Sequence, residues 1–169
     1  MRTFGVGAVS VVMGALVLAG CTPSEPEETT APPTVEPTVD ALETARQRYV
    51  EYLNAGLAML ENGTADPTLL DGIATPEQIA LNTADVEATL AQGYRAEGVY
   101  DVSAFQVHSE SEERLEALVC IDNSQVNIIR SGETQPASPA DPVRVTFELT
   151  PEPLVTYIDA VPEAVTFRC

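Results

Sequence analysis

The chain contains no lysine and no tryptophan, and its single histidine is His108. It has 26 acidic residues and 8 basic ones, so the formal net charge is −18 at pH 7. Such a charge repels polyanions, and nucleic acids and anionic lipid headgroups are therefore not expected as partners. With 169 residues, 44% of them hydrophobic, the chain still has enough apolar side chains for one compact core.

The sequence also lacks the signatures of common enzyme classes. It has no Gly-rich phosphate loop, HExxH pair, EF-hand spacing or G-x-S-x-G elbow. A catalytic triad would need His108, which lies beside a run of serines and glutamates. We interpret His108 as a solvated residue near the end of a strand. Of the three cysteines, Cys120 and Cys169 with one distant histidine are too few ligands for a metal site, so no metal and no cofactor is expected.

An apolar run from Phe4 to Leu18 is shorter than the roughly 20 residues that span a bilayer, and it predicts a signal peptide over residues 1–20. The run ends in LAGC at positions 18–21, which resembles the lipobox of bacterial lipoproteins. In those proteins the cysteine carries a thioether-linked diacylglycerol. The resemblance implies acylation of Cys21, for example with palmitate, and a position on the outer face of the cell membrane. An ordinary secreted protein is the alternative.

Residues 21–39 are rich in proline, threonine and glutamate and contain no aromatic residue. Such a segment cannot bury enough apolar surface to offset its ordering entropy, so we predict a disordered, extended tether. It resembles the O-mannosylated stalks of actinobacterial lipoproteins, although an unmodified spacer explains the composition equally well. The absence of lysine and the many alanines also fit a GC-rich actinobacterial source.

Once Cys21 is acylated, Cys120 and Cys169 are the two cysteines that remain. In an oxidising extracytoplasmic compartment they are expected to form a disulfide bond. Two free thiols or a metal pair are the alternatives. A bond between them would attach the C-terminus to the sheet.

Residues 40–169 suit a single domain. Apolar residues recur at intervals of three or four from Asp40 onward, which predicts a long amphipathic helix that ends at Asn62. A second helix is predicted from Thr75, with Pro76 at its first position and Gln78 reaching back to complete a capping box. Thr83 is an alternative start for a separate helix.

From Val99 onward the apolar period changes to two, which predicts strands. The expected strands lie around residues 115–121, 126–128, 143–149 and 165–167. Turns are predicted at residues 122–124 and 151–153, and a polar loop at 131–142. Helices followed by such strands indicate an α+β domain with N-terminal helices packed on a curved, mainly antiparallel sheet.

Three features carry a resemblance to a known group: RYVEYLNA at 48–55, CIDNS at 120–124 and the terminal cysteine. The domain resembles uncharacterised actinobacterial lipoproteins with a nuclear-transport-factor-2-like, cone-shaped fold. The resemblance covers about residues 40–169 and implies a cone-shaped domain. Cone-shaped relatives such as ketosteroid isomerase use a buried carboxylate and a hydrogen-bonding phenol.

The resemblance makes Tyr49 and Tyr52 candidate cavity-lining residues and Asp101 or Glu97 a candidate base. A purely structural role in the core is the alternative for the tyrosines. Our leading hypothesis is a non-enzymatic ligand-binding or accessory module of the cell envelope. Its expected partners are the membrane, through the lipid anchor, and a small apolar ligand or a cell-envelope protein. The alternatives are an isomerase, hydratase or hydrolase that uses a cone cavity, or a structural envelope component.

Overall fold

The computed structural model describes residues 39–149, 151–163 and 165–169. These residues form two α-helices and one five-stranded antiparallel sheet, which confirms the predicted α+β class; the sheet is open. The predicted signal peptide, Cys21 and all but the last residue of the predicted tether lie outside the described residues. No helix in the described part is long and apolar enough to cross a membrane.

Helix α1 spans Val39–Asn62 and ends, as predicted, before Gly63, whose φ of 71° is the left-handed conformation that favours glycine after a helix. A short 3-10 helix, η1, covers Pro67–Leu70. Helix α2 spans Pro76–Ala91, with proline in its first turn. It runs through Thr83 without a break, so the separate helix is excluded.

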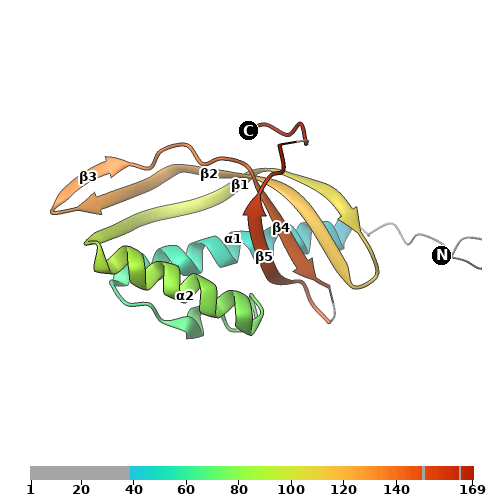
Figure 1. Ribbon diagram of the computed structural model, residues 1–169, viewed down its shortest axis with the longest axis horizontal. Coiled ribbons are helices and arrows are strands. Elements are labelled where there is room, and N and C mark those ends of the chain that lie inside the picture. The colour runs from blue at the N-terminus through green and yellow to red at the C-terminus, as the bar shows by residue number, and fades with distance from the viewer. Residues whose placement is uncertain (1–38, 150, 164) are drawn as a thin grey trace, which may run out of the picture. The chain divides into compact units, whose positions relative to one another are not determined.

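The sheet is built from two long strands and three short ones. They are β1 (Tyr94–Glu110), β2 (Arg114–Arg130), β3 (Glu133–Pro136), β4 (Val143–Glu148) and β5 (Leu154–Ala160). Their order is β1-β2-β4-β5, and β3 pairs with the last part of β2. In Figure 1, β1 and β2 form a long ribbon, both helices lie on the same side of it, and β4 and β5 run obliquely to it.

The turn predicted at residues 122–124 is wrong, because these residues lie inside β2. The Asp122 carboxylate accepts a hydrogen bond from the Ser124 N–H at 2.9 Å, a local contact that is also common in turns. Here it accompanies a bulge. Between the pairs Val99–Gln125 and Asp101–Asp122, β2 advances one residue more than β1, so the strand bends and continues.

The strand predicted around Val165 and Phe167 is also wrong. The described residues after Ala160 contain no strand, and the Phe167 N–H donates locally to the Val165 carbonyl. Two apolar residues at a spacing of two are too few to specify strand pairing. The predicted polar loop at 131–142 is likewise partly a strand, β3.

The capping box predicted for the second helix is not formed. Thr75 is the N-cap residue, but its side chain makes no capping bond. Gln78 instead donates from Nε2 to the Tyr52 hydroxyl at 2.8 Å and is buried. Gln78 thus bonds to Tyr52 on α1 instead of to the N-terminus of its own helix.

Buried side chains form two clusters. The main cluster lies between the helices and the shared part of β1, β2, β4 and β5. Its largest fully buried members include Tyr49, Met59, Leu70, Leu115, Val119, Val145, Phe147 and Val155. The ribbon cluster is Leu57, Ala96 and Val126. Leu60 packs against both.

Candidate functional site

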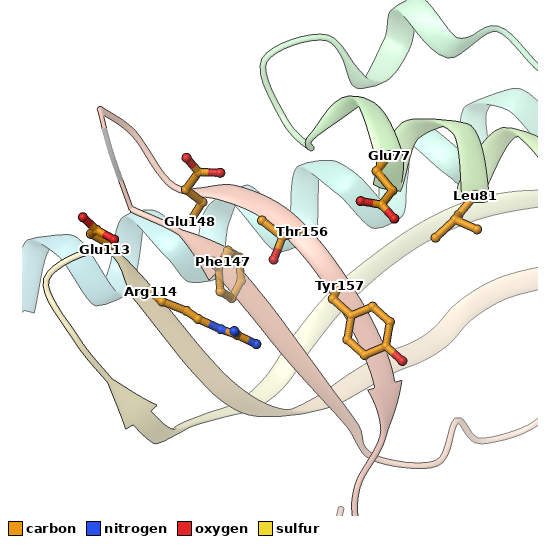
Figure 2. Close-up of a pocket in the computed structure, with 8 residues that line it drawn as sticks. All are labelled: Glu77, Leu81, Glu113, Arg114, Phe147, Glu148, Thr156 and Tyr157. Carbon is orange, nitrogen blue, oxygen red and sulfur yellow. The ribbon is translucent and has the colours of Figure 1, made fainter.

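A surface hollow of about 750 Å³ crosses β5, and we call it the edge groove. Figure 2 shows side chains from α2 on one side of the β5 ribbon and side chains from β2, β4 and the turn before β2 on the other. Its lining residues are Glu77, Leu81, Glu113, Arg114, Phe147, Glu148, Thr156 and Tyr157. None of the candidate residues predicted from the sequence lines it.

A second hollow of about 300 Å³, the interior pocket, opens between α1, α2 and the β1–β2 ribbon. Apolar side chains make up most of its wall, and most of its polar groups come from the helices. The lining residues are Tyr52, Leu53, Gly56, Leu57, Leu60, Asn82, Asp85, Val86, Thr89, Tyr100, Ile121, Asn123 and Ala140. Members of both buried clusters meet here, and the hollow marks the place where the two clusters do not merge.

The predicted tyrosines lie together on α1, but only Tyr52 lines the interior pocket. Tyr49 and Tyr52 are 1% and 4% exposed, and their rings stack with centroids 6.0 Å apart. Tyr49 is part of the main cluster and lines neither the interior pocket nor the edge groove. Of the two tyrosines, Tyr52 thus lies on the pocket wall, and Tyr49 stacks on it within the main cluster.

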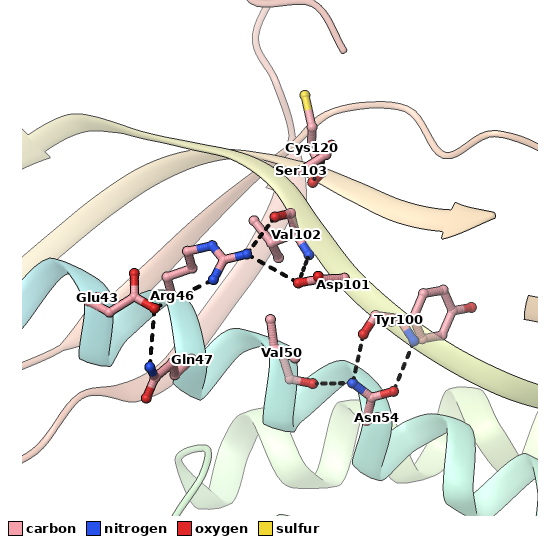
Figure 3. A network of polar contacts seen from close by, with 10 residues as sticks. All are labelled: Glu43, Arg46, Gln47, Val50, Asn54, Tyr100, Asp101, Val102, Ser103 and Cys120. Atoms are coloured by element: carbon pink, nitrogen blue, oxygen red, sulfur yellow. Dashed lines mark hydrogen bonds and ion pairs between the residues drawn. The ribbon is translucent and has the colours of Figure 1, made fainter. Parts of the chain in front are cut away.

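The candidate bases are not brought to the tyrosines. The Asp101 side chain is 65% exposed, and its carboxylate pairs with the Arg46 guanidinium at 3.1 Å, as Figure 3 shows. Glu97 and His108 are also exposed on β1. The structure thus offers no buried carboxylate at either position that sequence reasoning singled out.

The polar end of the interior pocket is a hydrogen-bonded group around the Tyr52 hydroxyl. It accepts from Gln78 Nε2 at 2.8 Å and from Asn82 Nδ2 at 3.0 Å. Gln78 Oε1 and Asn82 Oδ1 are both buried and have no protein partner. Of these two residues only Asn82 lines the pocket. A buried amide oxygen without a partner costs free energy, so the Asn82 end of the pocket is suited to a hydrogen-bonding ligand.

Burial raises the pKa of Tyr52 above its usual value, and the nearby carboxylate of Asp85 adds to the rise, against the two amide hydrogen bonds. Burial likewise raises the pKa of Tyr100, on the β1 side of the pocket. Both phenols therefore stay protonated at neutral pH. They offer hydrogen bonds and apolar ring surface rather than a proton-accepting group.

Helix α1 positions Tyr100 through the backbone of β1 (Figure 3). Asn54 Nδ2 donates to the Tyr100 carbonyl, and Asn54 Oδ1 accepts from the Tyr100 N–H, each at 2.9 Å. Arg46 donates to the Val102 carbonyl at 2.7 Å. These side chains satisfy the outer edge of β1, which would otherwise present free backbone groups.

Sequence reasoning missed Asn54, Gln78, Asn82 and Tyr100. A usable signal was present for two of them, because Gln78 and Asn82 lie four residues apart beside the apolar stripe of the second helix. Two amide side chains at that spacing, next to a buried helix face, are expected to hydrogen-bond to a buried polar group on another element. No local pattern pointed to Asn54, since its partner lies 46 residues away.

Cys120 and Cys169 form the predicted disulfide bond, with their Cα atoms 5.4 Å apart. The bond joins the C-terminal residue to the middle of β2, where Cys120 is buried. Among the described residues, no three His, Cys, Asp or Glu side chains are grouped to hold a metal ion.

No protein-family model matches the chain, and no curated protein matches it in sequence. Among solved structures it is similar to the intermembrane-space region of the chloroplast protein ARC6, with a TM-score of 0.51 and 13% identity over 75% of this chain and 100% of that one. A de novo designed β-sheet protein gives a TM-score of 0.37 at 16% identity, over 78% of this chain and 96% of that one. At 13% identity, the likeness to the ARC6 region concerns the fold alone.

Proposed function

We propose that the domain is a non-enzymatic binding module whose interior pocket takes a small, mainly apolar ligand with one hydroxyl or carboxamide group. The observation that carries the proposal is Asn82 on the pocket wall, whose buried Oδ1 has no protein partner while its Nδ2 donates to the Tyr52 hydroxyl. Gln78, which donates to the same hydroxyl but does not line the pocket, also has an unpartnered amide oxygen. The pocket volume of about 300 Å³ is at the small end of the usual range for ligand sites.

The chemistry of the polar end explains the choice of ligand. The Tyr52 oxygen accepts two hydrogen bonds, so its own proton needs an acceptor, while Asn82 Oδ1 needs a donor. If the Asn82 amide is rotated by 180°, the phenol proton is satisfied and an amide N–H is left free. The first orientation calls for a ligand group that both donates and accepts, and the second calls for an acceptor. A hydroxyl or carboxamide serves in both cases, and Asp85 at the pocket wall disfavours an anion.

The positions of the candidate acid–base groups favour binding over catalysis. An isomerase or hydrolase of the cone type needs a carboxylate with a raised pKa among apolar walls. Asp101, the predicted base, is exposed and paired with Arg46. The phenols of the pocket stay protonated at neutral pH, which supports a role in hydrogen bonding.

We further propose that this module belongs to a cell-envelope lipoprotein of actinobacterial type, held to the outer face of the membrane through Cys21 and the tether. The finer fold assignment, a nuclear-transport-factor-2-like cone, belongs to the same proposal. Its supports are the lipobox-like LAGC at 18–21, the disulfide bond and the helices packed on one side of the ribbon. Cell fractionation of a Cys21→Ser variant tests the anchor, and retention of the variant in the membrane would contradict it.

The ligand class is tested with four probes that share one ring: cyclohexylmethanol, cyclohexanecarboxamide, cyclohexanecarboxylate and methylcyclohexane. Binding is followed by chemical-shift changes of the backbone amides. We expect the alcohol and the carboxamide to bind about tenfold more tightly than the other two, and Asn82→Leu to remove this preference. The matched control is Asn127→Leu on β2, outside the pocket. Equal binding of the carboxylate, or loss of preference in the control, contradicts the proposal.

A further inference from the structure

The edge groove has the features of a docking surface for an extended peptide. Two of its lining residues, Leu81 and Tyr157, are among the large hydrophobic side chains that the fold leaves exposed, at 51% and 48%. Phe147, which also lines the groove, is fully buried. In Figure 2 the Tyr157 side chain projects from β5 and the Leu81 side chain projects from α2, so apolar side chains are available along this strand.

The groove carries an excess of unpaired negative charge. Glu77, Glu113 and Glu148 line it, and none of them forms an ion pair with another described residue. The guanidinium of Arg114 is paired with Glu116 at 3.0 Å. Three uncompensated carboxylates around exposed apolar side chains are complementary to a cationic, amphipathic partner.

The third feature of this docking surface is the open backbone edge of β5. At Val155 its outer edge is occupied, because the Val155 N–H donates to the Ile73 carbonyl and the Val155 carbonyl accepts from the Thr75 N–H. From Thr156 to Ala160, no backbone bond joins β5 to any described segment other than β4. An open edge of this kind is a template for adding a strand.

We propose that the edge groove docks an extended, basic segment of another protein. The segment pairs its main chain with β5 beyond Val155 and packs apolar side chains against Leu81 and Tyr157. It places basic side chains near Glu77 on one side of β5 and near Glu113 and Glu148 on the other. This proposal goes beyond ligand binding in the interior pocket and does not depend on it.

Charge decides between possible occupants. A second copy of this chain carries a net charge of −18 and is repelled. The segment 22–39 of the same chain contains four glutamates and no basic residue, so the groove repels it as well. A basic segment of a different protein is the occupant that the groove attracts.

The probe is a fluorescein-labelled nonapeptide in which arginine and valine alternate, and binding to the full chain is measured by fluorescence anisotropy. We expect it to bind and the same peptide with glutamate in place of arginine not to bind. The double variant Glu77→Gln/Glu148→Gln is expected to weaken binding at least tenfold. Its matched control, Glu87→Gln/Glu97→Gln, removes the same charge from exposed positions on α2 and β1 outside the groove and is expected to change binding less than twofold.

Two further arms separate docking from diffuse attraction. A nonapeptide N-methylated at alternate residues keeps its charge but cannot pair with a strand edge, and we expect at least tenfold weaker binding. Tyr157→Ala, at an exposed site that tolerates truncation, is expected to weaken binding several-fold. The proposal is overturned if the arginine peptide does not bind, if the control double variant weakens binding as much as the groove variant, or if N-methylation has no effect.

Discussion

The two buried clusters share the strands β1 and β2 but differ in what covers them. The main cluster is enclosed by α1, α2, β4 and β5, and eight of its large side chains are fully buried. The ribbon cluster contains Leu57, Ala96 and Val126, with partly buried neighbours on α1, β1, β2 and the loop after β3. The same strand pair is thus a core element at one end and a thinly covered ribbon at the other.

The interior pocket lies at the boundary between these two regions. Its wall takes Tyr52 and Val86 from the main cluster and Leu57 from the ribbon cluster. Where a well-packed core gives way to a sparse one, side chains no longer fill the space between the helices and the sheet. The comparison teaches that the candidate site is a consequence of uneven covering along one long strand pair.

The largest expected effect comes from truncating a buried side chain of α1, and the comparison is between one such side chain in each cluster. Tyr49→Ala should lower the free energy of unfolding by about 3–5 kcal/mol, as large aromatic-to-alanine changes in cores do. Leu57→Ala, two turns further along α1, is expected to cost about 2 kcal/mol because its surroundings are less confined. Urea denaturation of both variants measures the difference. Equal losses would break the comparison.

Removal of the disulfide bond is expected to have the next largest effect. Cys169→Ser leaves the buried Cys120 in place and removes only the covalent link, which closes a loop with a sequence separation of 49 residues. We expect a loss of about 2–4 kcal/mol in urea denaturation. Because Cys120 lies next to Val119 of the main cluster, the global transition should move to lower urea. An unchanged midpoint would show that the link does not constrain the main cluster.

Gly98→Ala tests the ribbon directly. Gly98 has φ of 118°, and a Cβ at this position would run into the carbonyl oxygen of Gln125 on the paired strand. The strain should cost about 1–3 kcal/mol. We expect faster hydrogen exchange around Ala96 and Val126 with little change at Val119. Uniformly faster exchange would mean that the two regions unfold as one unit, and Gly132→Ala, with open space around it, controls for positive φ alone.

The smallest effect is a dependence of stability on alkaline pH that originates in the main cluster. Burial raises the pKa of Tyr49 above its ordinary value of 10.0, and Tyr52 and Tyr100 nearby raise it further. Above pH 10 the unfolded chain loses this proton while the folded chain keeps it, so stability falls as pH rises. For one phenol, the free energy of unfolding falls by about 1.4 kcal/mol per pH unit between the pKa of the unfolded chain and that of the folded chain. Below the pKa of the unfolded chain it does not change with pH.

Denaturation at pH 9, 10 and 11 checks this sign. Tyr49→Phe should make the decline shallower above pH 10, whereas Leu57→Ala should lower stability by the same amount at each pH. A decline that begins well below pH 10, or one that Tyr49→Phe leaves unchanged, would show that other groups control the alkaline transition.

Local patterns in the sequence predicted the secondary structure better than the site. The apolar stripe of α1 and its stop at Asn62 follow from contacts within one helix, and the prediction was confirmed to within one residue at its start. At residues 122–124 the sequence predicted a turn, and Asp122 and Ser124 do form a local hydrogen bond. The pairing of β1 with β2 makes this segment a bulge within a strand instead. The same local hydrogen bond is compatible with a turn and with a bulge, and only pairing with the neighbouring strand decides which of the two forms.

The sequence by itself determined the α+β class, the two helices, the acidic character and the two cysteines that pair. Each of these depends on composition or on periodicity within one element. The tertiary structure decided the interior pocket, which unites Tyr52, Asn82 and Tyr100 from three elements, and the edge groove, which needs the open side of β5. The physical reason is that a pocket's chemistry depends on which side chains lack partners, and partners are assigned only when distant segments pack.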